Sequence, residues 1–378
     1  MANRKREPRW EPYVLWQDAE FSACWKDRFM ERTRNVLIIA GLGFDPRAVF
    51  VSQELVNAGG AGRRDLWLLC YDNGQETTDA QRATVASNEA GFRALFNGSR
   101  TLLRLPIAMR TDRARSATCQ NTKAAISKPD ELLRYDDVIV DISALPRMIS
   151  LMTLAQLLAL FDDQEAKGQP APNLHVVAAE SVAHDLGTTE NSFDPDVILL
   201  TGFSGRLDSE ALQNPKIWVP ILGEGQDISL QRIFDKVQPD QICPVVPFPT
   251  RDPRRGDRII ESHQRILFDE FGVEPRNILY ASEYNPFEAY REVFMAIDRY
   301  RDALVELGDC RVFVSPLSSK LLSVSVLLAC YDHKRQKSGK FDVGIPYVEV
   351  ASYGDSDTNL QAEQILTSMW LTGEWERS

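Results

Sequence analysis

Short apolar runs of strand length alternate with longer helical patterns along this chain. Strand patterns lie at 36–40, 65–71, 101–107, 138–142, 173–180 and 196–201, and again at 241–248, 277–281, 311–314 and 345–350. Helical patterns lie at 48–56, 78–96, 148–161, 259–271, 287–307 and 321–331, with a terminal helix expected over 361–370. Strands that are apolar nearly throughout and alternate with helices indicate parallel sheets covered on both faces.

One strand–turn–helix pattern occurs twice and organises the rest. The strand at 138–142 leads through a polar turn to Arg147, and the helix that follows carries no charge over 148–161. The strand at 311–314 leads through a serine-rich turn to Lys320, and 321–331 is again free of charge. A charge-free helix in a globular protein is buried on most sides. Each turn should therefore open at the carboxyl end of a sheet, where α/β folds bind ligands.

A second match supports an internal repeat. Asp45-Pro46-Arg47 follows the first strand of one half, and Asp252-Pro253-Arg254 follows the first strand that the pattern predicts in the other. We therefore expect an α/β protein of two Rossmann-like parallel-sheet domains related by internal duplication, with an N-terminal helical extension. The expected boundaries are 1–35 for the extension, 36–205 for the first domain and 206–378 for the second.

The turns favour an anionic ligand. A helix N-terminus presents unpaired backbone N–H groups and the positive end of the macrodipole, and both suit phosphate. The residues expected to contact such a ligand are Asp45, Arg47, Asp141, Ser143 and Arg147 in the first half and Arg251, Asp252, Arg254, Glu283, Asn285, Ser318, Ser319 and Lys320 in the second. The alternative is structural: local ion pairs within each Asp-Pro-Arg turn, and Asp141 capping the turn after its strand.

Several chemistries lack their motifs. Gly41-x-Gly43 has no third glycine for a dinucleotide fingerprint, and neither half contains a Walker P-loop. The four histidines do not fall at metal-ligand spacing, so neither a metal nor a cofactor is predicted. Glu180, His184 and Asp185 cluster beyond one strand as an alternative site, and Glu283 or His184 would be the acid/base group of an enzyme.

Composition indicates the cellular compartment. The chain has 378 residues, a net charge of −11 and six cysteines without CxxC spacing, which favours reduced thiols and a cytoplasmic protein. No signal peptide is evident, and no run approaches the roughly 18 apolar residues of a membrane span. The segment 104–128 is rich in Lys and Arg. It is interpreted as a solvated surface loop, with a cap over an anionic ligand or a nucleic-acid contact as alternatives.

The N-terminal region carries an aromatic stripe. Phe21, Trp25 and Phe29 recur at every fourth residue, which predicts a helix with one aromatic face. We expect this extension to pack on the body of the protein, with a partner-binding arm as the alternative.

The repeated turn resembles that of CARF-type proteins, the Rossmann-like sensors of cyclic oligoadenylates in antiviral systems. Their motif, Asp/Asn-x-Thr-Gly-Gly-Thr-Lys, opens a buried helix. Here Asp141-Ile142-Ser143-Ala144-Leu145-Pro146-Arg147 holds that position, with Ser for the first Thr, Arg for Lys and no Gly-Gly pair. The stretch 315–320 matches less well. The resemblance implies paired ligand sites and a role in defence.

These observations lead to one expectation and two alternatives. We expect a soluble sensor that binds a phosphate-bearing nucleotide, such as a cyclic or oligonucleotide messenger, between its two halves. It would act with a partner effector protein in bacterial defence or stress response, without a membrane. The first alternative is a hydrolase or transferase that uses the same pocket on a nucleotide or phosphorylated metabolite. The second is a structural subunit of a larger complex.

Overall fold

The computed structural model describes residues 7–377, apart from 76, 99, 112–114, 181–189, 208, 210–212, 337–341 and 354–363. The chain forms two compact units. The first unit comprises Tyr13–Ser192 and Ala351–Ser378, and the second comprises Met1–Pro12 and Phe193–Val350. The chain therefore passes from one unit to the other at three places.

Among its described residues the first unit contains a seven-stranded sheet in the order β1-β14-β6-β5-β2-β3-β4. Strands β2 to β6 are mutually parallel, while β14 is antiparallel to both β6 and β1. Its strands are β1 (Val14–Gln17), β2 (Val36–Leu42), β3 (Arg64–Asp72), β4 (Leu102–Ala108), β5 (Asp137–Asp141), β6 (Asn173–Glu180) and β14 (Ile365–Thr372). Numbered by their succession in the chain, the parallel strands follow the order 3-2-1-4-5 of a Rossmann fold.

The second unit repeats this order. Its sheet runs β11-β10-β8-β12-β13-β7, and the first five of these strands are parallel. The strands are β7 (Glu190–Ser204), β8 (Lys216–Ile221), β9 (Gln241–Ile242), β10 (Val245–Pro247), β11 (Leu279–Ala281), β12 (Arg311–Pro316) and β13 (Asp342–Tyr353). Both units are thus Rossmann-like, as the sequence pattern predicts.

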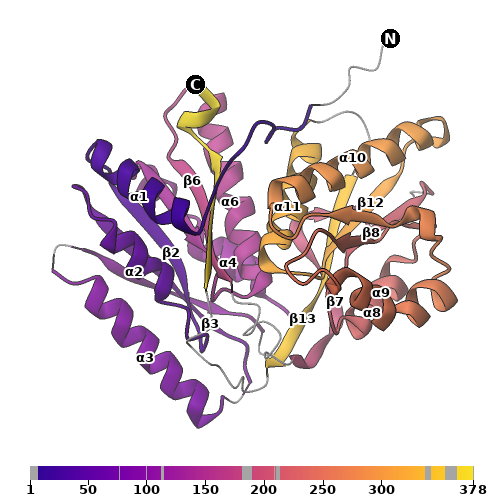
Figure 1. The fold of residues 1–378 in the computed structure, drawn as a ribbon, viewed down its shortest axis with the longest axis horizontal. Helices are drawn as coiled ribbons and strands as arrows, with labels where there is room; N and C mark the ends of the chain where they lie inside the picture. The colour runs from indigo at the N-terminus through magenta and orange to yellow at the C-terminus, as the bar shows by residue number, and fades with distance from the viewer. Residues whose placement is uncertain are drawn as a thin grey trace. The chain divides into compact units, whose positions relative to one another are not determined.

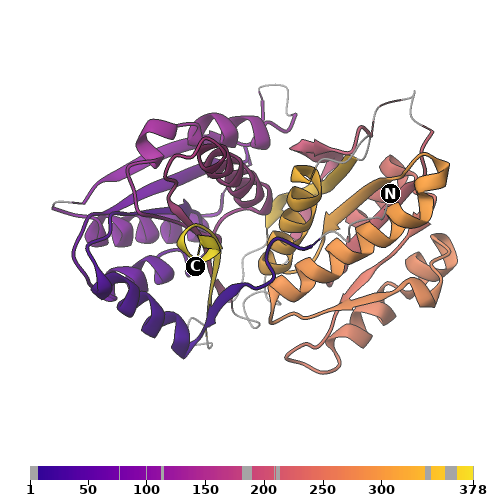
Figure 2. The ribbon, with the colours of Figure 1, turned by 90° about the horizontal axis from the view of Figure 1, so that it is seen from above.

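Helices cover both faces of each sheet (Figures 1 and 2). In the first unit α1, α2 and α3 lie on one face and α4 and α6 on the other; in the second, α10 and α11 lie opposite α8 and α9 (Figure 1). The first unit has α1 (Ala19–Glu31), α2 (Phe50–Asn57), α3 (Asp79–Leu95), α4 (Thr118–Ile126), α5 (Pro129–Leu132), α6 (Arg147–Ala166) and the 3-10 turn η4 (Glu374–Arg377). The second has α8 (Asp227–Val237), α9 (Arg255–Ser262), the π-helical turn η1 (Arg265–Glu270), η2 (Pro275–Asn277), α10 (Pro286–Leu304), η3 (Val305–Leu307) and α11 (Lys320–Arg335).

The aromatic stripe near the N-terminus is internal. Phe21, Trp25 and Phe29 of α1 are at most 1% exposed and join one core cluster with side chains of β2, β3 and α2. Farther upstream, Trp10 packs edge-on against Tyr290 of the second unit, with ring centroids 5.2 Å apart. The rings of Trp10, Phe21, Trp25 and Phe29 are thus buried, as expected for an extension packed on the body of the protein, while Tyr13 is 39% exposed.

The structure differs from the sequence expectation in several elements. The segment 361–370, expected as a helix, contains most of strand β14, whose residues are buried on both faces and so show no alternation. Strand β8 and helix α8 occupy a stretch for which no element is predicted. The expected domain boundary at 205 also differs, because β7 pairs with β13 and β14 joins the first sheet.

A buried ionic network holds the ends of the first unit to its sheet. Asp137, fully buried at the start of β5, accepts hydrogen bonds from Arg28 Nη2 at 2.5 Å and Arg34 Nη1 at 3.2 Å, and His175 Nε2 lies 3.3 Å from it. Arg34 also bonds Glu374 at 2.9 Å. Burial raises the pKa of Asp137, but the hydrogen bond from His175 and the nearby cations more than reverse this, and its pKa lies below the usual range.

We predict that this network makes the first unit sensitive to acid. Burial lowers the pKa of His175 from 6.5 to about 4, so the unfolded chain binds the proton first as the pH falls. Stability should be complete above pH 6.5 and fall toward pH 4, by up to about 1.4 kcal/mol per pH unit. His175→Gln should flatten this dependence. Trp16, Trp25 and Trp370 surround the ring, so tryptophan fluorescence during urea unfolding reports it. An unchanged slope in the variant would contradict the assignment.

Candidate ligand site at the sheet switch points

In each unit the strand order reverses between two central strands, which is where α/β sheets bind ligands. In the first unit these strands are β2 and β5, and in the second they are β8 and β12. The turns that follow them contain most of the residues predicted from sequence.

The switch point of the first unit is bridged by a tyrosine. Tyr71, from the end of β3, donates a hydrogen bond to the carbonyl of Ala144 at 2.8 Å, and burial raises its pKa above the usual range. A Cβ built on Gly43 would lie 1.8 Å from the Tyr71 hydroxyl, and one on Gly41 would lie 2.8 Å from the side chain of Leu145. The two glycines therefore give room to the chain's own Tyr71 and Leu145 side chains.

The first Asp-Pro-Arg turn forms a local ion pair. Arg47 donates to both carboxylate oxygens of Asp45, at 3.0 and 2.8 Å, and its guanidinium lies 3.4 Å from the carbonyl of Ala179. Asn88 of α3 donates to the carbonyls of Gly43 and Asp45 and fixes the turn from behind. Arg47 thus forms the local ion pair that was the structural alternative to ligand binding, and its side chain is only 6% exposed.

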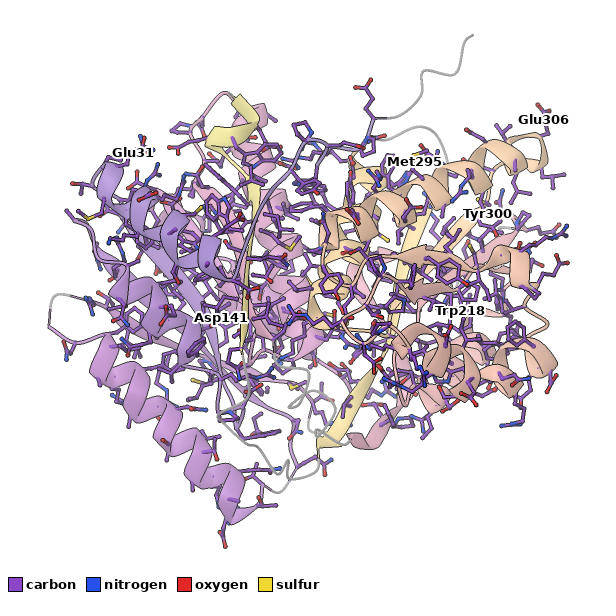
Figure 3. The ribbon with its side chains drawn as sticks, viewed as in Figure 1. Glu31, Asp141, Trp218, Met295, Tyr300 and Glu306 are labelled. Carbon is purple, nitrogen blue, oxygen red and sulfur yellow. The ribbon has the colours of Figure 1, made fainter. Side chains whose placement is uncertain are left out.

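Hydrogen bonds of Asp141 and Ser143 link the end of β5 to β6. Asp141, labelled in Figure 3, accepts from the backbone N–H of Ser143 at 2.9 Å and from its hydroxyl at 2.6 Å. The Ser143 hydroxyl in turn accepts from the N–H of Ala179 in β6 at 2.8 Å. Both side chains are at most 2% exposed. Arg147 is the first residue of α6 and is partly exposed, whereas Asp141 and Ser143 are buried.

The matching turn of the second unit begins α11. Ser319 caps the helix by accepting from the N–H of Leu322 at 3.2 Å, Ser318 is 7% exposed, and Lys320 is the partly exposed first residue. The opposing turn follows β8, and a Cβ on its Gly223 would lie 2.3 Å from the carbonyl of Leu317. The two turns are therefore in close contact at this switch point.

A buried histidine anchors the turn after β8. His263 is fully buried; its Nε2 lies 2.8 Å from the carbonyl of Gly223 and its Nδ1 lies 2.9 Å from the carboxylate of Asp227. Both ring nitrogens of His263 therefore have partners, and its role here is to hold the turn.

The turns after β8, β10 and β11 are joined by one arginine. Arg255 donates to Glu224 at 2.6 and 2.8 Å and also bonds Glu283. Burial raises the pKa of Glu224, and the Arg255 guanidinium more than offsets this, so the pKa is lowered. Glu283 also accepts from the N–H of Arg251 at 3.2 Å, so both of its carboxylate oxygens have partners. Asn285 caps α10 by accepting from the N–H groups of Phe287 and Glu288.

The two Asp-Pro-Arg turns are not equivalent in the fold. The first follows β2, which is strand 1 of its sheet, whereas the second follows β10, which is strand 2. Asp252 pairs with Arg258 at 2.6 Å and not with the Arg254 side chain. The topological counterpart of the Gly41–Gly43 turn is the turn with Gly223 and Gly225 after β8. The match between the two Asp-Pro-Arg tripeptides therefore no longer supports an internal repeat. The shared strand order and the equivalent positions of Arg147 and Lys320 still support it.

The remaining sequence candidates are dispersed. Glu180 ends β6, while His184 and Asp185 lie outside the described residues. The basic segment 104–128 is not a single loop, since it includes part of β4 and all of α4. No cluster of three or more potential metal ligands occurs among the described residues. Within the same residues, no helix has the length and apolar character to span a bilayer.

Sequence reasoning missed the residues that shape the turns. Tyr71, Asn88 and Arg255 were not singled out, although each fixes a turn at the carboxyl end of a strand. The only sequence signal was their type, a polar side chain within or near an apolar run, and their partners are distant in the chain.

Comparison with known proteins assigns the chain to no family. No family model matches the chain, and no curated protein matches it. Among solved structures it is similar to a type III CRISPR defence DNA nuclease activated by cyclic oligoadenylate, at 9% identity and a TM-score of 0.41. That match covers 78% of this chain and 63% of the nuclease chain, less than two thirds of its length. The cytoplasmic domain of a prokaryotic cation chloride cotransporter matches at 9% identity and a TM-score of 0.23, over 85% of this chain and 96% of that one. The class that the fold defines is a two-unit Rossmann-like α/β protein.

We predict that Gly43→Ala destabilises the first unit by about 1–3 kcal/mol, because the added methyl overlaps the Tyr71 hydroxyl. The cost should shrink in a Tyr71→Ala background, where the overlap is gone. A double-mutant cycle of urea unfolding free energies measures the coupling. Additive effects of the two substitutions would show that Tyr71 does not set the glycine requirement.

Proposed function

We propose that this protein is a sensor that binds a phosphate-bearing nucleotide at the carboxyl edge of a sheet, where the turns after the central strands lie. One observation carries the proposal: both buried helices at the switch points, α6 and α11, begin with a cation and have no acidic residue in the first turn. Helices α3, α8, α9 and α10 each carry an acid there. Helices α2 and α4 also lack an acid in the first turn but begin with Phe50 and Thr118, so the combination with a cation distinguishes α6 and α11 from them.

The electrostatics explain why this arrangement suits an anion. A cation at a helix N-terminus opposes the macrodipole, at a cost of about 0.3–1 kcal/mol at an exposed site. A bound phosphate reverses the sign, because it receives the helix N–H groups and the side-chain charge together. The Ser319 hydroxyl accepts from the N–H of Leu322 and can still donate its own proton beside Lys320, whereas Asp141 and Ser143 are hydrogen-bonded to each other and to β6. We therefore assign the principal site to the second unit, at Lys320, and a secondary site to Arg147.

The class of ligand follows from the CARF-type resemblance of the Asp141–Arg147 turn. A cyclic or linear oligonucleotide messenger in bacterial defence, acting through a partner effector, is the function we infer. Calorimetric titration gives the number of ligands bound per chain and tests whether one unit or each unit has a site.

The enzyme alternative has less geometric support. Glu283, its expected acid/base group, has both oxygens engaged by Arg255 and the Arg251 backbone. A general base needs an oxygen directed at substrate. Incubating the protein with a nucleotide panel and analysing for products separates the two functions, since a sensor binds without turnover. The structural-subunit alternative would be favoured by an absence of binding.

We predict that Lys320→Ala weakens binding of phosphate-bearing ligands at least tenfold, because it removes the cation beside the α11 N-terminus. Thermal shift against mono-, di-, cyclic and oligonucleotides identifies the ligand, since a compound at 100 times its Kd stabilises by about 2.7 kcal/mol. Calorimetric titration of the variant then gives the affinity.

Lys167→Ala is the matched control, because Lys167 is 55% exposed, pairs only with its helix neighbour Asp163 in the contacts described, and lies at the far end of α6. It should bind as the unsubstituted protein does. If no phosphate-bearing compound shifts the melting temperature, or Lys320→Ala binds normally, the proposed site is refuted.

A further inference from the structure

Two aromatic side chains are exposed beside each other on the second unit. Phe248 is 53% exposed and Tyr280 is 52% exposed, and their rings meet edge to face with centroids 6.0 Å apart. Tyr280 lies in β11 at the edge of the sheet, and Phe248 directly follows β10. Large aromatic side chains are generally buried, so an exposed contacting pair indicates a surface with a binding role.

The backbone holds this pair in place. The N–H of Phe248 donates to the carbonyl of Ala281 at 2.7 Å, and the N–H of Glu283 donates to the carbonyl of Pro249 at 3.1 Å. The turns after β10 and β11 therefore run side by side beyond the strands. Val246 of β10 is paired in register with Tyr280 of β11, so their side chains lie on the same face of the sheet. A Cβ built on Gly256, at the start of α9, would contact the Val246 side chain, so α9 covers this face beside Tyr280.

Cations adjoin the aromatic pair. The Arg251 guanidinium lies over the ring of Tyr284, 5.7 Å from its centroid, and Arg254 is exposed three residues farther along. Within the described part of the chain neither Arg251 nor Arg254 forms an ion pair, whereas Arg258 is neutralised by Asp252 and Arg255 by its two glutamates. Among the described residues, Arg251 and Arg254 are therefore two exposed arginines without a side-chain ion pair, on the segment that directly follows Phe248.

We propose that Phe248 and Tyr280 form a stacking platform for a nucleobase, and that Arg251 and Arg254 face the phosphate or sugar edge of the same ligand. Base-on-aromatic stacking with arginine beside it is how proteins hold unpaired nucleotides. This inference rests on the proposed function and names the part of the ligand that the turns at Lys320 do not explain. It assigns the ligand class as base-bearing, in preference to a sugar phosphate or an inorganic polyphosphate.

The platform also constrains ligand size. Strands β11, β10, β8 and β12 are successive neighbours, so β11 lies about 14 Å from β12, three steps of about 4.8 Å each. A ligand that places phosphate at Lys320 and a base on the platform must extend across those strands. A ligand that contacts only the platform and its two arginines can be as small as a single nucleotide.

The test compares probes with and without a base. Adenosine triphosphate, a linear triadenylate and inorganic tripolyphosphate are titrated into the full chain and into the Phe248→Ala/Tyr280→Ala variant. Loss of stacking should weaken the base-bearing probes about tenfold to a hundredfold and leave tripolyphosphate unchanged. The control is Val305→Ala/Leu307→Ala, which removes exposed aliphatic side chains of the same unit, 60% and 67% exposed, outside the platform.

The outcomes separate this inference from the proposed function. If the unsubstituted chain binds tripolyphosphate as tightly as the base-bearing probes, the platform is refuted while the phosphate site stands. If Lys320→Ala has no effect but the aromatic variant loses the base-bearing probes, the phosphate site is refuted and the platform stands. No binding of any base-bearing probe overturns the platform. An altered oligomeric state in the aromatic variant, with unchanged binding of the probes, would assign the pair to a protein interface and also overturn it.

Discussion

Reversal of the strand order at the centre of each sheet is the constraint on which the candidate sites depend. Neighbouring parallel strands at this point lead into helices on opposite faces, so their turns diverge at the carboxyl edge. In the first unit the strands are β2 and β5, and in the second β8 and β12. Because α6 and α11 are buried helices, their first residues are fixed at this edge, and Arg147 and Lys320 occupy corresponding positions in two sheets of the same order.

The two units use this shared geometry differently. In the first, Tyr71 bridges the turns, Asp45 pairs with Arg47, and Asp141 with Ser143 ties β5 to β6. Most polar groups there are engaged in holding the turns. In the second unit the turns are joined by Arg255 at one place, and the exposed Arg251, Arg254, Phe248 and Tyr280 lie on and just beyond β10 and β11. A ligand site is therefore better supported in the second unit, although the cation at the helix start is common to both.

Buried polar contacts divide between supporting the fold and shaping the edge. The Asp137 network lies at the amino end of β5, away from the turns, and secures α1 and the C-terminal residues to the sheet. A buried charge requires such partners, because its desolvation is costly. At the carboxyl end, Asn88, Asn285 and Ser319 serve as turn braces and helix caps. Substituting a cap or brace would alter the edge indirectly, which is why the proposed tests rely on Lys320 and on the exposed rings.

The sequence by itself determined the fold class and the position of the two buried helices. Apolar runs without charges, such as 148–161 and 321–331, have few structural solutions, so their burial and the polar turns before them follow from pattern alone. Strand β8 escaped prediction because Pro220 interrupts its short apolar run, and β14 because the buried polar residues Thr367 and Ser368 interrupt its apolar pattern. Missing β8 moved the second Asp-Pro-Arg turn to the wrong strand of the repeat. The partners of Tyr71 and Arg255, and the exposure of Phe248 and Tyr280, were decided only by the tertiary structure, because each depends on which distant turn lies alongside.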